Sequence, residues 1–247
     1  MTSDALFQHV EDLHRGRPLG TVLDAGTGEH SLRWLTTLGA KVTGVTADEP
    51  TAARLRTQFP DVEVVTGDWQ DEGLLRGRRY DVVVADYLLG AIDGFAPYFQ
   101  EHVFTRLRPH VGDRLYAIGL EPWPARADDP DAQAFIDLCR TRDAAFLLAG
   151  TRPYREFPEA WVAETLEGSG YAVIDRNRFP IRHSARTIDR EHGNVVRYAQ
   201  RCERDLGAAV TRRADGLRER LLARVRREPL LFGLDWVVAA GPTSGAS

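Results

Sequence analysis

Acidic and glycine residues stand together where the first short apolar run of the chain ends. This run is followed by Asp24-Ala25-Gly26-Thr27-Gly28, and a helical pattern begins directly after the second glycine. Two glycines allow a tight turn and let a ligand approach main-chain atoms, and the first N–H groups of a helix are available to receive it. The segment therefore predicts a ligand-binding turn, with a turn that binds nothing as the alternative.

The glycine turn suits two classes of ligand. The dinucleotide pattern G-x-G-x-x-G places its third glycine, which permits close packing under a pyrophosphate, where this chain has Ser31. Glu29, at the start of the helix, would also repel a diphosphate. An adenosyl-sulfonium ligand carries no phosphate, and an acid at Asp24 suits its cationic amino-acid part. The turn therefore favours an adenosyl ligand over a dinucleotide.

Strand and helix patterns alternate around this turn. Short runs rich in Val and bounded by Gly and Asp are typical of buried parallel strands, and their alternation with helices predicts a doubly wound α/β sheet with right-handed crossovers. Ligands of such sheets lie at the carboxyl ends of the strands. The acids that follow strand patterns, and are expected at that edge, are Asp24, Asp48, Asp68, Asp86 and Glu121.

Composition narrows the class of protein further. The chain has 247 residues, 43% hydrophobic and 28% charged, which is ordinary for a globular enzyme. Its net charge is −4, whereas a nucleic-acid-binding protein usually has a basic excess. No apolar run is long enough to span a membrane, the N-terminal segment lacks a secretory pattern, and Cys139 and Cys202 lack the CxxC spacing of a metal site. We expect a cytoplasmic enzyme without a metal, a nucleic-acid partner or a membrane partner.

Several motifs together resemble class I S-adenosylmethionine-dependent methyltransferases, from about Val22 to Pro242. "LDAGTGEHS" is similar to the first motif of that family, with His30 in place of its third glycine, and "VVTGDW" is similar to the motif after the third strand. "YDVVVADYLL", "FTRLRPHVGDRLYAIG" and "DWVVAAGP" resemble later strands. The resemblance implies S-adenosylmethionine as cofactor and a mostly parallel seven-stranded sheet of order 3-2-1-4-5-7-6, with the last strand antiparallel and helices on both faces.

The same resemblance assigns roles at the cofactor site. It implies that Asp68 accepts a hydrogen bond from the adenine amino group and that Trp69 lies beside the ring. The family usually has a ribose-binding acid where this chain has Thr46; Asp48, two residues later, either reaches the ribose or only caps the next helix. The expected cofactor-binding residues are Asp24, Ala25, Gly26, Thr27, Gly28, Thr46, Asp48, Gly67, Asp68, Trp69 and Asp86.

Methyl transfer requires an aligned nucleophile, exclusion of water and, for some acceptors, a base. Asp86 is expected to be that base or to hold the ammonium group of the ligand, and Tyr87 to stack on a cationic or aromatic group; a helix cap and a core tyrosine are the alternatives. The candidate catalytic residues are Asp86, Tyr87, Glu121 and His183, although a lone histidine is also a common structural donor.

Substrate contacts are expected from the loop after the fourth strand and from "GTRPYREFP". An arginine of this second segment could bind a carboxylate, with a solvated surface as the alternative for the arginine and helix packing as the alternative for Tyr98. The candidate substrate-binding residues are Tyr87, Asp93, Tyr98, Arg152 and Tyr154.

We expect one methyltransferase-like domain over residues 1–247. A helical insertion at 187–228 is predicted to form a cap with the N-terminal helix 4–15, and its apolar stripe could support a homodimer. Within the insertion, Gly207 and Gly216 are the positions at which the helix could split or bend.

The chemistry predicted is methyl transfer to an O-, N- or C-nucleophile of a small molecule. The segment "ADYL" lacks the Asn/Asp-Pro-Pro-aromatic motif of methyltransferases that act on flipped bases. Fold alone does not separate this reaction from an azetidine-forming cyclisation that releases methylthioadenosine, or from non-catalytic binding of an adenosyl ligand. A nicotinamide dehydrogenase is a more distant alternative.

Overall fold

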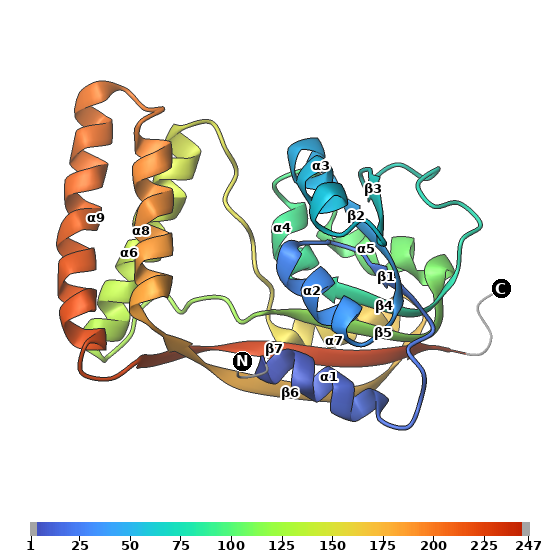
Figure 1. Cartoon of the computed structure of the whole chain (residues 1–247). Coiled ribbons are helices and arrows are strands. Elements are labelled where there is room, and N and C mark those ends of the chain that lie inside the picture. The colour runs from blue at the N-terminus through green and yellow to red at the C-terminus, as the bar shows by residue number, and fades with distance from the viewer. Residues whose placement is uncertain (1–3, 244–247) are drawn as a thin grey trace. The chain divides into compact units, whose positions relative to one another are not determined.

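The structure, a computed structural model that describes residues 4–243, contains a seven-stranded sheet (Figure 1). The strand order is β3-β2-β1-β4-β5-β7-β6. The strands that the ladders pair are parallel from β3 to β5, and β7 runs antiparallel to β5. This confirms the predicted α/β fold and its strand order. The strands are β1 (Thr21–Asp24), β2 (Lys41–Thr46), β3 (Glu63–Thr66), β4 (Tyr80–Asp86), β5 (Val111–Leu120), β6 (Tyr171–His183) and β7 (Leu230–Pro242).

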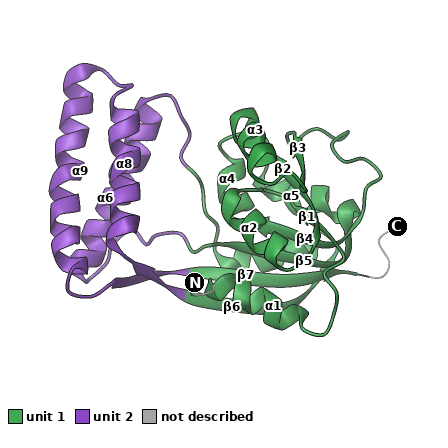
Figure 2. Ribbon diagram, in the orientation of Figure 1, with its two compact units in different colours: residues 1–121, 154–179, 235–247 green, residues 122–153, 180–234 purple. Residues whose placement is uncertain are grey.

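Two compact units divide the chain (Figure 2). Unit 1 contains residues 1–121, 154–179 and 235–247, and unit 2 contains residues 122–153 and 180–234. Strands β6 and β7 each contribute residues to both units. The helices of unit 1 are α1 (Ala5–His14), α2 (Glu29–Thr37), α3 (Glu49–Gln58), α4 (Leu88–Ile92), α5 (Gln100–Leu107) and α7 (Glu159–Gly168), with a 3₁₀ turn at Arg108–His110.

Each face of the sheet in unit 1 has its own apolar core. Helices α1, α2 and α3 pack on one face, which carries alternate residues such as Val22, Val84 and Val237. Helices α4, α5 and α7 pack on the other face, around residues such as Leu23 and Val83. Successive side chains of a strand point to opposite faces, and burial on both sides explains why these strands read as continuous apolar runs.

Helix α1 is held within unit 1 by aromatic and polar contacts. Phe7 stacks on Trp34 of α2 with ring centroids 4.1 Å apart, and the Trp34 indole donates a hydrogen bond to Glu11. His9 Nε2 lies 2.8 Å from Asp175 of β6. These contacts fix helix α1 on the α2 face of the sheet.

Unit 2 consists largely of three packed helices, α6 (Pro130–Leu148), α8 (Ala185–Ala199) and α9 (Arg204–Val225). The split between α8 and α9 falls at 200–203 and not at Gly207 or Gly216. Gly207 instead allows close packing, since a Cβ there would lie 2.4 Å from the Ala199 carbonyl oxygen. The proposed cap of helices over the site stays a prediction. Among the described residues, no helix is long and apolar enough to cross a membrane.

Candidate active site

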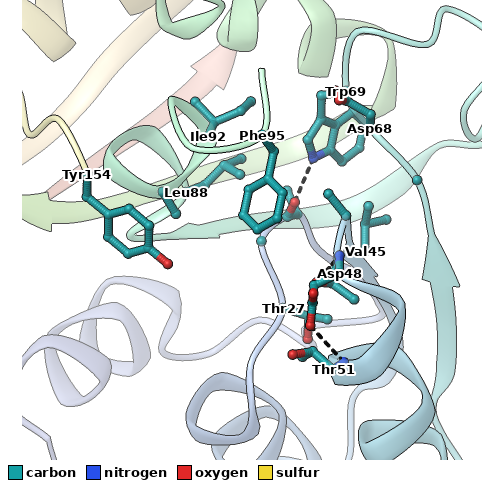
Figure 3. Close-up of a pocket in the computed structure, with 16 residues that line it drawn as sticks. Thr27, Val45, Asp48, Thr51, Asp68, Trp69, Leu88, Ile92, Phe95 and Tyr154 are labelled. Atoms are coloured by element: carbon teal, nitrogen blue, oxygen red, sulfur yellow. Dashed lines mark hydrogen bonds between the residues drawn. The ribbon is translucent and has the colours of Figure 1, made fainter. Parts of the chain in front are cut away.

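A cavity of about 370 Å³ opens at the carboxyl ends of β1, β2 and β3 (Figure 3). Its floor is the glycine turn, one side is the loop between β2 and α3, and the other is helix α4 with the segment after it. It is lined by Ala25, Gly26, Thr27, Val45, Thr46, Ala47, Asp48, Thr51, Gly67, Asp68, Trp69, Leu88, Ala91, Ile92, Phe95 and Tyr154.

Hydrogen bonds to two strands and to the segment after a third fix the glycine turn. The Ala25 N–H donates to the Val84 carbonyl and the Thr27 N–H donates to the Val45 carbonyl, both at 2.8 Å. The Trp69 indole, which is buried, donates to the Ala25 carbonyl at 2.7 Å. Because partners on β2, β4 and the segment after β3 all hold it, the turn is set before any ligand binds.

Asp24 supports the same turn from beneath. Its carboxyl is fully buried and accepts hydrogen bonds from the hydroxyls of Thr27 at 2.7 Å and Ser31 at 2.6 Å. Burial raises the pKa of Asp24 to about 6, although the two hydroxyl donors act in the opposite direction. A Cβ at Gly26 would lie 3.1 Å from the Leu88 side chain of α4, so any larger residue here would require Leu88 to shift.

Two carboxylates point toward the cavity from its rim. Asp48 Oδ2 accepts from the Thr51 N–H at 2.9 Å and so caps α3, while Asp48 also lines the cavity. Asp68 Oδ1 accepts from the Gln70 N–H at 2.9 Å. Both acids are half-buried. The cap and the ribose contact, alternatives in the sequence, are therefore compatible at Asp48.

An apolar wall faces these acids. Leu88, Ala91 and Ile92 of α4 contribute aliphatic surface, and the aromatic rings of Phe95 and Tyr154 stand at the opening (Figure 3). Phe95 is 49% exposed and Tyr154 is 56% exposed. A cavity with one apolar wall and a few placed polar groups is typical of small-ligand sites.

Comparisons with solved structures identify the fold, whereas no protein-family model and no curated protein matches the chain. A putative methyltransferase from Bacillus halodurans is 13% identical with a TM-score of 0.60, over 96% of this chain and 99% of its own. A 1,6-didemethyltoxoflavin-N1-methyltransferase from Burkholderia thailandensis, crystallised with its substrate and S-adenosylhomocysteine, is 20% identical with a TM-score of 0.53, over 98% and 80%. The chain has the class I methyltransferase fold.

A third neighbour of this fold is described as a cyclase. The 4+2 cyclase SpnF is 16% identical with a TM-score of 0.56, over 97% of this chain and 80% of its own. The class I methyltransferase fold is thus found in proteins described with different reactions, and function must be argued from the site.

Most of the expected cofactor-binding residues line the cavity. Asp24, Gly28 and Asp86 do not line the cavity, although Asp24 supports the turn. Sequence reasoning missed Val45, Thr51 and the α4 residues; their position beside strand ends was the only available signal. The expected residues that do line it are Ala25, Gly26, Thr27, Thr46, Asp48, Gly67, Asp68 and Trp69, with Tyr154 from the expected substrate set.

Asp86 is the last residue of β4 and Tyr87 precedes α4, and neither residue lines the cavity. Asp86 Oδ1 is buried and has no hydrogen-bond partner among the described residues. Burial, and then the charges of Asp24, Asp4 and Asp235, raise the pKa of Asp86 to about 8. Tyr87 has a left-handed backbone, with φ of 48°, and its hydroxyl donates to Asp235 Oδ1 at 2.7 Å.

Two of the expected catalytic residues have structural partners away from the cavity. Glu121 accepts from the Glu159 N–H at 3.2 Å and pairs with Arg178 of β6 at 3.2 Å. His183 belongs to unit 2, where its Nε2 donates to the Phe232 carbonyl at 2.8 Å and burial lowers its pKa. Their catalytic roles stay predictions.

The remaining expected substrate residues also lie outside the cavity lining. Asp93 is buried and accepts from the Tyr98 N–H at 3.1 Å. Tyr98 is 67% exposed, and the Arg155 guanidinium lies 5.8 Å from the centre of its ring. Arg152 belongs to unit 2. The structure therefore brings Tyr154, but not these three residues, to the wall of the cavity.

Proposed function

We propose that the chain is an S-adenosylmethionine-dependent methyltransferase that acts on a small molecule. One observation carries this proposal: the sixteen residues that line the cavity include two carboxylates and no Arg, Lys or His. A dinucleotide pyrophosphate needs cationic or N–H-rich surroundings. An adenosyl ligand with a positively charged sulfur suits a negatively charged cavity instead.

The lining residues fit the parts of that cofactor. Asp68 can accept a hydrogen bond from an adenine amino group, and Asp48 can accept from the ribose hydroxyls. Leu88, Ile92 and Phe95 offer an apolar surface for the flat adenine ring. Bound S-adenosylmethionine would supply a methyl group on a positively charged sulfur.

The chain's own residues then align the reactants and control protons. The fixed glycine turn holds one reactant without reorganisation, which lowers the entropic cost of alignment. Asp86 keeps its proton below about pH 8, the pKa to which burial and neighbouring acids raise it. It can therefore remove a proton from an acceptor only as the pH approaches that value, and a methyl transfer that uses Asp86 as base should accelerate from pH 6 to pH 9.

Two neighbours support the small-molecule class of substrate. One is described as acting on 1,6-didemethyltoxoflavin, and the other as a 4+2 cyclase. These descriptions concern those proteins. For this chain they favour a small acceptor over a macromolecule, in agreement with the net charge of −4.

Two measurements test the proposal. Calorimetry of the full chain should show binding of S-adenosylhomocysteine and no binding of NAD, and the reverse result would reject it. Mass spectrometry after incubation with S-adenosylmethionine and pooled metabolites should show S-adenosylhomocysteine and an acceptor heavier by one methyl group. Methylthioadenosine formed without any acceptor would instead identify the cyclisation.

A further inference from the structure

Three acids lie on one face of the sheet: Asp24 and Asp86 are the last residues of β1 and β4, and Asp235 lies within β7, opposite Leu120 at the end of β5. Asp24, Asp86 and Asp235 each stand two positions along their strand from a residue of the α2-side core, namely Val22, Val84 and Val237. Side chains two positions apart on a strand share a face. We refer to Asp24, Asp86 and Asp235 as the carboxylate row.

The carboxylate row continues where the cavity stops. Along the order β3-β2-β1-β4-β5-β7, the cavity lies over β3, β2 and β1, and the row runs from β1 through β4 to β7. Asp86 and Asp235 do not line the cavity, but Leu88, two residues after Asp86, does, so Asp86 lies next to the α4 wall of the cavity. An acceptor held at Asp86 would therefore lie close to a cofactor bound in the cavity.

The charges around Asp86 are all of one sign. Asp24 lies on β1, Asp235 on β7 and Asp4 at the start of α1, and each of them raises the pKa of Asp86. Burial also raises the pKa of Asp235 to about 6, although the Tyr87 hydroxyl acts against this. Like charges gathered in a buried place are unfavourable unless a cation compensates them.

Two buried oxygens of the row, Asp24 Oδ1 and Asp86 Oδ1, have no hydrogen-bond partner among the described residues. The other oxygen of Asp24 holds Thr27 and Ser31, which explains why that acid is there. Asp86 has no comparable internal contact. A buried acceptor without a donor costs free energy, and a donor supplied by a ligand would recover it.

We propose that Asp86, flanked by Asp235 and Tyr87, binds the ammonium group of an amine acceptor. The inference rests on the proposed function, since it places the acceptor next to the methyl donor. An ammonium group supplies both things that the site lacks: N–H donors for Asp86 Oδ1 and a positive charge among the acids. The Tyr87 hydroxyl, which already donates to Asp235, keeps that carboxylate oriented beside the site.

Binding of an ammonium group should also release a proton. Asp86 is largely protonated near neutral pH, because burial and the neighbouring acids raise its pKa to about 8. A cation beside Asp86 favours its charged form, so its proton leaves to solvent as the complex forms. A neutral ligand with a hydroxyl group would leave that proton in place.

The test is calorimetry of the full chain, saturated with S-adenosylhomocysteine, against n-butylamine near pH 7, with n-butanol and butyrate as neutral and anionic probes. We expect n-butylamine to bind at least about tenfold more tightly than either probe. Repeating the titration in two buffers of different ionisation enthalpy should show proton release. Equal binding of the three probes would overturn the inference while leaving cofactor binding intact.

Variants separate this site from the cofactor's own ammonium group. Asp86→Asn should weaken n-butylamine binding about tenfold and Asp235→Asn about threefold. Asp113→Asn should have no effect, because Asp113 lies near the start of β5, whereas Asp235 pairs with Leu120 at its end. Each variant is also titrated with S-adenosylhomocysteine and with methylthioadenosine, which lacks the amino-acid part. If Asp86→Asn weakens S-adenosylhomocysteine alone and leaves n-butylamine unchanged, Asp86 serves the cofactor and the inference is wrong.

Discussion

The acids of the cavity, Asp48 and Asp68, come just after strands, whereas the acids of the carboxylate row belong to the strands themselves, and the surroundings of the two groups differ. Asp48 and Asp68 are half-buried, and each accepts a hydrogen bond from a backbone N–H two or three residues later. Asp86 and Asp235 are more strongly desolvated, and their pKa values rise to about 8 and about 6. The cavity acids are thus ready-made acceptors, whereas ionisation of the row has a cost in free energy that a cationic ligand can offset.

The largest effect that separates the two groups is expected for Asp86→Asn. In the unfolded chain Asp86 ionises near its ordinary pKa of 3.8, whereas in the folded chain it ionises at about 8. Ionisation of Asp86 therefore has no effect on the free energy of unfolding below pH 4. It lowers this free energy progressively as the pH rises from 4 to 8, and the loss stays constant above pH 8. The neutral asparagine should add about 3 kcal/mol to the free energy of unfolding at pH 8 and almost nothing at pH 4.

Urea unfolding at several pH values measures this difference. Asp113→Asn is the matched control, because Asp113 is an exposed acid on β5 that pairs with Arg17 and Arg114. It should lower the stability slightly or leave it unchanged at every pH. Equal stability of Asp86→Asn and the original chain at pH 8 would mean that Asp86 is solvated, and that the acids of the carboxylate row do not differ in solvation from the acids of the cavity.

Asp24 belongs to the row but supports the cavity, so its removal tests where the two regions meet. Asp24→Ala leaves the buried hydroxyls of Thr27 and Ser31 without their acceptor, and the glycine turn loses its support from below. We expect affinity for S-adenosylhomocysteine to fall about thirtyfold, or about 2 kcal/mol, by calorimetry. Unchanged affinity would show that the backbone bonds from β2 and β4 hold the turn alone.

The difference between the cavity acids and the carboxylate row could be predicted from the sequence only in part. The motifs and the alternation of strands and helices predict the order of the sheet and the residues of the glycine turn, because both depend on local sequence. Whether an acid is solvated depends on what covers it. Asp235 reaches the row through the antiparallel pairing of β7 with β5, more than a hundred residues away in sequence, and no local pattern indicates that contact.

Glu121 also shows that local sequence does not predict the partners of an acid. It comes directly after β5, as Asp86 comes at the end of β4, and the strand-end rule selects both. In the structure Glu121 pairs with Arg178 of β6 and accepts a hydrogen bond from the Glu159 N–H. These partners come from distant segments, so a rule based on strand ends identifies a set of acids but not which of them keep an oxygen for a ligand.

A smaller effect is expected within the cavity itself. Asp68→Ala should weaken binding of S-adenosylhomocysteine about tenfold, because a charged acceptor on the adenine amino group is lost. Asp71→Ala is the matched control, since Asp71 is exposed, lies three residues later and does not line the cavity. Calorimetry that gives the same loss for both variants would remove Asp68 from the adenine site and with it the main distinction between cavity and row.

The smallest effect concerns the hydroxyl that joins Tyr87 to the row. Tyr87→Phe removes the donor that lowers the pKa of Asp235, so this pKa should rise further above 6 and the cost should appear mainly at pH 8, at about 1 kcal/mol. Tyr171→Phe is matched, because its hydroxyl donates to a neutral acceptor, the Phe104 carbonyl, at 3.1 Å. Its cost should be equal at pH 5 and pH 8, and only a pH-dependent cost at Tyr87 fits an Asp235 that becomes charged in the folded chain between these two pH values.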